Sequence, residues 1–212
     1  SDEFLKFTTI LRYLALIAAM SSFSLGFSII SKKQNYSLRE KIFPAGFWMV
    51  FTSSSILALS YLSLTGESPY LAIWIVSVAL FHVFISSIRS ENPNSANQVT
   101  ILLKIILLLI VVLICVLATD SPLNFFPVYG GLLLICIIGL SLNRGYIINP
   151  LKFNIKIAIE LFIHTFSRAI DNISRLAFHV APVWCAGYLL NTDAAGLTAL
   201  ALTFTKAFES SL

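Results

Sequence analysis

Long apolar runs separated by short polar connections constrain this chain more than any other feature of its sequence. The runs cover residues 7–30, 44–64, 71–88, 101–119, 124–142, 157–190 and 195–212. At about 1.5 Å per residue, each of the first five has roughly the length that a helix needs to cross a hydrocarbon core of about 30 Å. Six of the seven prolines lie at or between the ends of the runs, which supports these limits. The sequence therefore predicts an all-α integral membrane protein, a polytopic bundle of about seven transmembrane helices.

Composition agrees with a membrane protein and argues against a soluble one. Charged residues make up 11% of the chain, against about 25% in a typical soluble domain. The net charge is +4, but the basic residues lie in short connections and form no patch that could bind nucleic acid. We therefore expect membrane lipids around the protein and no nucleic-acid partner.

The charges of the connections predict an orientation. Connections 31–43 and 143–156 each carry a net charge of +3, and connection 89–100 is neutral. The N-terminal residues and the remaining three connections each come to −1. Because positive connections stay in the cytoplasm, the three connections 31–43, 89–100 and 143–156 should lie on the cytoplasmic side, with the first residues on the opposite side.

One run contains a stripe of ionisable side chains. Their spacings of four, four, three, four and four residues place them on one face of a helix, within an arc of about 100 degrees. We call these residues the polar stripe: Glu160, His164, Arg168, Asp171, Arg175 and His179. The run that contains them has 34 residues, about 51 Å as a continuous helix, so it should lie partly along the interface, tilt, or bend at Pro182.

Three interpretations of the polar stripe remain open. Its four formal charges would together cost about 10 kcal/mol facing lipid at mid-depth, so they need protein or water. The helix could lie on the membrane surface with the stripe among the headgroups. Alternatively, Asp171 could pair with Arg168 and Arg175 and hold helices together. In the third interpretation the stripe lines a water-filled cavity and binds a polar or anionic substrate headgroup.

The third interpretation gives the residues defined roles. Arg168 and Arg175 lie two turns apart and could hold a phosphate group by charge-assisted hydrogen bonds. Asp171 would separate the two guanidinium groups in an empty site, or accept a proton. His164 and His179 are too far apart along a helix to share a metal ion, and no catalytic arrangement or glycine-rich phosphate loop is visible. We therefore expect no enzyme, no cofactor and no metal.

The sequence GYLLNTDAAGLTALA at residues 187–201 resembles the join between the seventh and eighth helices of polysaccharide (O-antigen type) lipid flippases. These belong to the multidrug/oligosaccharidyl-lipid/polysaccharide exporter superfamily. In that family a helix ending in Gly and apolar residues meets a short acidic turn, followed by Ala-Gly and a helix of small residues. The sequence SLGF at residues 24–27, ahead of a basic connection, is similar to the end of the family's second helix. The resemblance spans nearly the whole chain, whose seven runs would stand for helices two to eight.

The resemblance implies a partial flippase fold in a multi-pass protein of the bacterial inner membrane. Residues 1–145 would form five helices of a first bundle without the family's first helix, and residues 146–212 would begin a second bundle. Since the chain begins with Ser1 and ends within an apolar run, we expect a fragment of a longer protein.

In this family, cationic residues in the cavity between the bundles hold a lipid-linked pyrophosphate, a role that would fall here on Arg168 and Arg175. The acidic and histidine residues of this run depart from the family pattern, so the family's cationic arrangement does not transfer residue by residue. The implied function is the outward flipping of an oligosaccharide on undecaprenyl pyrophosphate, an O-antigen unit of lipopolysaccharide or another surface polysaccharide. Association with a glycan polymerase or glycosyltransferases is a further expectation.

Other functions stay open. In a multidrug exporter of the same superfamily, Asp171 or Glu160 would couple transport to an ion gradient. A polymerase or ligase of glycan assembly usually carries a large polar periplasmic loop, whereas the outside connections here are only a few residues long. A helix-packing or immunity-type membrane protein is the remaining alternative.

Overall fold

The structure is a computed structural model of the whole chain, and it describes residues 2–22, 25, 28–29, 37–118 and 124–209. Nearly all of these residues are helical, and none of them lies in a strand. The elements are α1 (Asp2–Ser22), η1 (Leu38–Ile42), α3 (Phe43–Thr65), α4 (Leu71–Glu91), α5 (Pro93–Ala118), α6 (Phe125–Asn143), η3 (Pro150–Lys152), α7 (Ile155–Leu189) and α8 (Thr192–Glu209). The all-α class is confirmed, and an α-helix lies at the position of each apolar run.

Four helical segments are long and apolar enough to cross a membrane, by length and composition. They are Leu38–Thr65, Leu71–Glu91, Pro93–Ile114 and Phe125–Asn143. The described parts of α1, α7 and α8 contain only shorter apolar stretches, so the count differs from the seven predicted spans. In α7 the charges of the polar stripe interrupt the apolar sequence, and the apolar run of α1 continues into residues outside the described ones. The chain thus has the helices of a multi-pass membrane protein.

The limits of the helices follow side-chain caps as well as apolar runs. The apolar sequence predicts a helix start at residue 101, but α5 begins at Pro93. The Asn92 side chain accepts hydrogen bonds from two backbone N–H groups of the first turn, at 3.1 and 3.2 Å. Helix α8 likewise begins three residues before the predicted position 195, behind a cap from Asn191. Both starts were missed because the first turns are polar.

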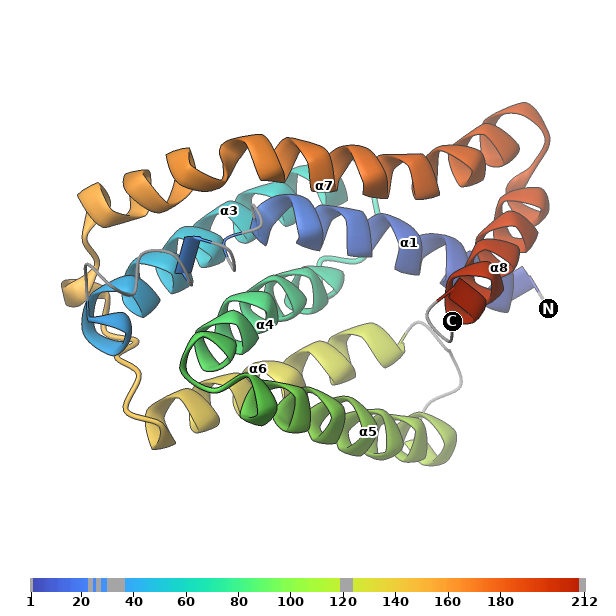
Figure 1. Cartoon of the computed structure of the whole chain (residues 1–212). Helices are drawn as coiled ribbons and strands as arrows, with labels where there is room; N and C mark the ends of the chain where they lie inside the picture. The colour runs from blue at the N-terminus through green and yellow to red at the C-terminus, as the bar shows by residue number, and fades with distance from the viewer. Residues whose placement is uncertain (1, 23–24, 26–27, 30–36, 119–123, 210–212) are drawn as a thin grey trace.

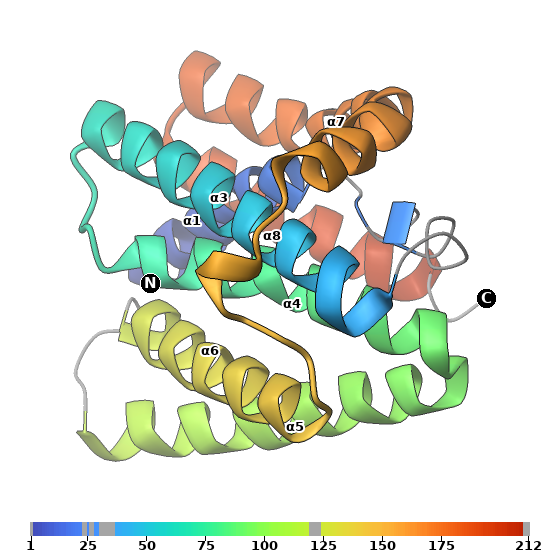
Figure 2. The same ribbon diagram turned by 90° about the vertical axis from the view of Figure 1, so that its left-hand side faces the viewer.

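Helix α4 lies at the centre of the bundle. It packs against α1, α3, α5 and α6, and most of its side chains are buried. Figure 1 and Figure 2 show α5 and α6 on one side of the bundle and α7 on the other, with α1, α3 and α4 between them. Helix α5 exposes a long row of Leu and Ile side chains, such as Leu102, Ile105 and Leu109, as a helix facing lipid does.

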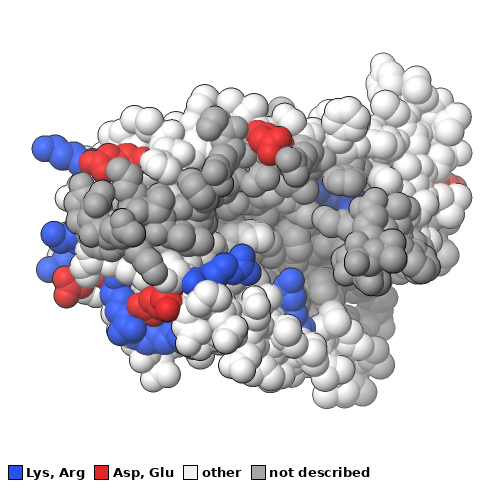
Figure 3. Space-filling view, in the orientation of Figure 1, with Lys and Arg blue, Asp and Glu red and all other residues white. Residues whose placement is uncertain are grey.

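The two ends of the bundle carry different connections. At one end, the guanidinium of Arg39 in η1 pairs with the Glu91 carboxylate at 2.8 Å, and the Tyr146 hydroxyl donates to the same carboxylate at 3.0 Å. These three residues come from the three connections predicted to share one side. At the other end, Lys6 lies 3.9 Å from Glu67. Figure 3 shows charged side chains gathered at the first end, where α3 and α7 begin. The contacts thus bring the three connections predicted to share one side together at one end, while connection 119–123 lies outside the described residues.

Candidate functional site

All six residues of the polar stripe lie in α7, a continuous helix of 35 residues that passes through Pro182. At about 1.5 Å per residue, its length of about 52 Å exceeds the hydrocarbon core, as predicted. A break at Pro182 does not occur. Among the stripe residues, His164 and Asp171 are exposed and Glu160 is half-buried, whereas the side chains of Arg168, Arg175 and His179 lie outside the described part of the structure.

Helix α7 has three faces that run along its length. One face is buried against the bundle; its residues are Ile157, Ala158, Leu161, Thr165, Ala169, Val180 and Val183. The polar stripe lies about a quarter-turn to one side of this face. About a third of a turn to the other side, a row of large apolar side chains is exposed; its members are Ile159, Ile163, Phe166, Ile170 and Trp184. The stripe therefore lies on the flank of α7, along the edge of its contact with the bundle.

Helix α7 is held mainly by α1 and α8, and also touches α3. The hydroxyl of Ser28 donates to the Leu161 carbonyl at 2.9 Å, which fixes the first half of α7 against the chain that follows α1. Nearer its end, the rings of Tyr13 and Trp184 lie 6.2 Å apart. The Ser28 bond lies on the buried side of α7, whereas Trp184 belongs to the exposed apolar row, so neither contact involves the polar stripe.

Arg12 of α1 has a partner that its sequence position did not predict. Its position near the start of an apolar run suggests a side chain that reaches the interface, but it donates to the Ala199 carbonyl of α8 at 3.3 Å. A close approach of α7 and α8 accompanies this bond, since a Cβ at Gly187 would lie 3.2 Å from the Cβ of Ala195. Arg12 therefore joins the first and last helices of the chain, and no local pattern marks that contact.

Sequence reasoning also missed the cluster of Arg39, Glu91 and Tyr146. The Arg39 guanidinium makes two hydrogen bonds to the carboxylate, at 2.8 and 3.4 Å, and lies 5.8 Å from the centre of the Tyr146 ring. Nearby, the Trp48 indole donates to the Ile148 carbonyl at 2.8 Å. These contacts satisfy the cluster internally, so it joins three connections and does not form a ligand site. Only the grouping of the connections could have indicated it.

Among the described residues, no group of three His, Cys, Asp or Glu side chains could hold a metal ion. The ionisable groups of α7 that the structure describes are spread along one helix and do not converge on a point. Such an arrangement can bind an elongated or moving polar group along its length. Comparisons of the chain with family models, with curated proteins and with solved structures found no match.

Proposed function

We propose that this protein is part of a membrane transporter that moves a substrate with an anionic headgroup, and that the polar stripe of α7 lines the path of that headgroup. More specifically, we propose that the substrate is a lipid-linked oligosaccharide of the bacterial inner membrane. Arg168 and Arg175 would bind its pyrophosphate by charge-assisted hydrogen bonds. Asp171 would compete for the two guanidinium groups when the substrate leaves.

The position of the stripe on α7 is the observation that supports this proposal. An ionisable row used only to join helices would lie within the buried face, but that face carries apolar residues and one threonine. A row on the exposed side would meet lipid, where its charges would be costly. The flank between these positions suits a polar path along the edge of the bundle, and the exposed side chains of His164 and Asp171 agree with it.

The proposal is tested in cells whose surface glycan depends on this protein. The double variant Arg168→Ala/Arg175→Ala should lower glycan export about tenfold or more, because each lost charge-assisted bond is worth about 1.5 to 3 kcal/mol. A control variant, Lys104→Ala/Arg144→Ala, removes the same charge from α5 and from the connection after α6, and should export normally. Membrane levels of each variant are measured by immunoblot.

Normal export by the Arg168→Ala/Arg175→Ala variant at normal membrane level would show that these arginines do not bind the substrate. A loss of drug resistance with unchanged surface glycan would instead assign the protein to multidrug export, with Asp171 or Glu160 as the group to test for ion coupling.

A further inference from the structure

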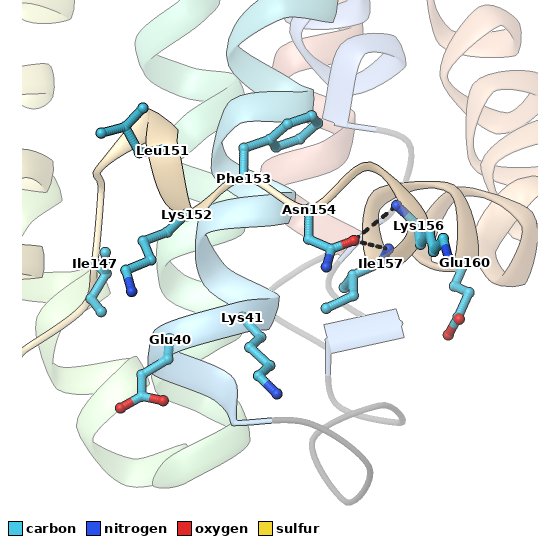
Figure 4. A pocket seen from close by; sticks show the side chains of 10 residues that line it. All are labelled: Glu40, Lys41, Ile147, Leu151, Lys152, Phe153, Asn154, Lys156, Ile157 and Glu160. Atoms are coloured by element: carbon cyan, nitrogen blue, oxygen red, sulfur yellow. Dashed lines mark hydrogen bonds between the residues drawn. The ribbon is translucent and has the colours of Figure 1, made fainter.

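A surface pocket of about 570 Å³ lies at the charged end of the bundle, where η1 faces the segment that leads into α7. Figure 4 shows the residues that line it: Glu40, Lys41, Ile147, Leu151, Lys152, Phe153, Asn154, Lys156, Ile157 and Glu160. Except for Glu160, which begins the polar stripe, none of them belongs to the site proposed above. The pocket is therefore a separate feature at the end of the bundle.

The segment from η3 to α7 has an apolar side and a basic side. Figure 4 shows Leu151 and Phe153 on the side toward which α3 runs, and Lys152 pointing the opposite way. The Leu151 side chain is 89% exposed, and Ile155 beyond it is 59% exposed. Since α3 is one of the helices able to cross a membrane, the apolar side chains point toward the membrane interior. An amphipathic segment with this orientation lies at the boundary between hydrocarbon and headgroups.

Three lysines of the pocket, Lys41, Lys152 and Lys156, have no carboxylate partner within the described residues. The two carboxylates of the lining belong to Glu40 and Glu160, and Figure 4 shows both at the lower rim, directed away from the segment that carries Lys152. Lys152 points from the segment toward the side of Glu40, and Lys41 lies between the two glutamates, so the three lysines exceed the two carboxylates of the lining by one positive charge. Ammonium groups at this depth attract phosphate.

Two backbone N–H groups at the start of α7 are already hydrogen-bonded and are not free to bind an anion. The Asn154 side chain accepts hydrogen bonds from the backbone N–H groups of Lys156 at 3.0 Å and of Ile157 at 3.3 Å. These bonds satisfy the donors that would otherwise attract an anion to the start of a helix. These two amides are therefore not free for an anion, and the lysine side chains are the cationic donors of the pocket.

We propose that this pocket binds the headgroup of an anionic phospholipid in the leaflet at this end of the bundle. Lys152 and Lys156, at the two ends of the pocket, supply the positive charge that attracts its phosphate, and Leu151 and Phe153 lie among its acyl chains. Lys41 on η1 approaches the headgroup from the opposite wall. A phospholipid combines the phosphate and the apolar tails that the two sides of the segment require, whereas a soluble phosphate compound would leave Leu151 in water. The inference does not depend on the transported substrate.

The test uses the full chain purified in a non-ionic detergent and titrated with fluorescent phosphatidylglycerol. Lys152→Gln/Lys156→Gln should bind it about thirtyfold more weakly, because each lysine near a membrane surface contributes about a factor of five. Lys152→Arg/Lys156→Arg should bind like the wild type. The control Lys6→Gln/Lys104→Gln removes the same charge elsewhere and should stay within about twofold of the wild type, since distant charges are screened.

Competition on the unmodified protein identifies the ligand without relying on a variant. Unlabelled phosphatidylglycerol should displace the probe, whereas phosphatidylcholine and inorganic phosphate should not. Equal displacement by phosphatidylcholine would contradict the requirement for an anionic lipid, and displacement by inorganic phosphate would assign the pocket to a free anion. Unchanged binding by the glutamine variant would overturn the assignment of the two lysines.

Discussion

Tyr146 is 1% exposed, yet its hydroxyl reaches a carboxylate at the charged end of the bundle. Its ring stacks on Phe43 at 4.6 Å, and its hydroxyl donates to Glu91 at 3.0 Å. Burial raises the pKa of the Tyr146 hydroxyl, and the negative charge of Glu91 together with the hydrogen bond to it raises the pKa further. The neutral phenol is therefore the form that stabilises the fold.

This pKa predicts the direction of a pH effect. A group whose pKa is raised on folding contributes stability that is fully present below its unfolded pKa, about 10 for tyrosine, and is lost as the pH rises through the folded pKa. Tyr146→Phe should lower the free energy of unfolding at pH 8 by about 1 to 2 kcal/mol, because Glu91 loses a hydrogen bond. Above pH 10 the difference should shrink as the wild type loses this contribution.

Unfolding in detergent at pH 8 and pH 11 measures both effects, and the six tyrosines common to both proteins cancel in the comparison. A difference between wild type and Tyr146→Phe that is as large at pH 11 as at pH 8 would refute this account of the Tyr146 pKa.

The sequence predicted the polar stripe but not the Tyr146 cluster, because only the stripe lies within a single helix. The stripe repeats within a single helix, so helical periodicity alone places Glu160, His164 and Asp171 on one flank. Arg39, Glu91 and Tyr146 are far apart in the sequence, and their contact depends on how α3, α4 and the connection after α6 end beside one another. No short-range pattern records that arrangement.

The contact between α4 and α6 is the closest helix packing that the structure describes around a glycine. A Cβ at Gly130 would lie 2.7 Å from the Cα of Trp74, a backbone atom that no side-chain rotation can move away. In addition, the buried Ser77 hydroxyl donates to the Gly130 carbonyl at 2.7 Å. A small residue that allows two helices to approach closely, and a hydroxyl that forms a hydrogen bond between them, are typical of helix packing in membranes.

Gly130→Ala should therefore force α4 and α6 apart and lower the free energy of unfolding by about 1 to 3 kcal/mol. Gly131→Ala is the matched control, because a Cβ at Gly131 would meet nothing within 4 Å. That neighbouring change should be neutral or stabilise the helix by about 0.5 to 1 kcal/mol. Thermal unfolding in detergent compares the two variants, and equal melting temperatures would show that the close approach at Gly130 does not determine stability.

At the level of elements, apolar length predicted the helices better than it predicted their ends. The predicted run 124–142 differs from α6 by one residue at each end, because apolar sequence and helix coincide there. Helix α5 extends eight residues beyond its predicted start, since the Asn92 cap begins the helix within polar sequence. The length of α7 was predicted well, but hydropathy alone does not say which of its flanks meets the bundle.

For the whole molecule, the predicted alternation of connections agrees with the contacts at the two ends of the bundle. The surroundings of the polar stripe could not be predicted in the same way. They depend on α1 and α8, which pack on α7 from opposite ends of the sequence. Contacts of this kind, such as Arg12 with the Ala199 carbonyl, are set by tertiary packing and have no local signal.

The central claim is that the polar stripe faces water along the edge of the bundle, while the exposed apolar row on the other side of α7 faces lipid. Adjacent positions at the same depth test it: His164→Cys against Ile163→Cys, and Asp171→Cys against Ile170→Cys, each in a chain whose native cysteines are replaced by alanine. The rate of labelling by a charged, membrane-impermeant thiol reagent is measured in intact membranes. Because only a hydrated thiol ionises and reacts, residues 164 and 171 should label about tenfold or more faster than residues 163 and 170. Labelling at 164 alone would place the stripe at the membrane surface, and equal rates within both pairs would contradict a water-filled path along α7.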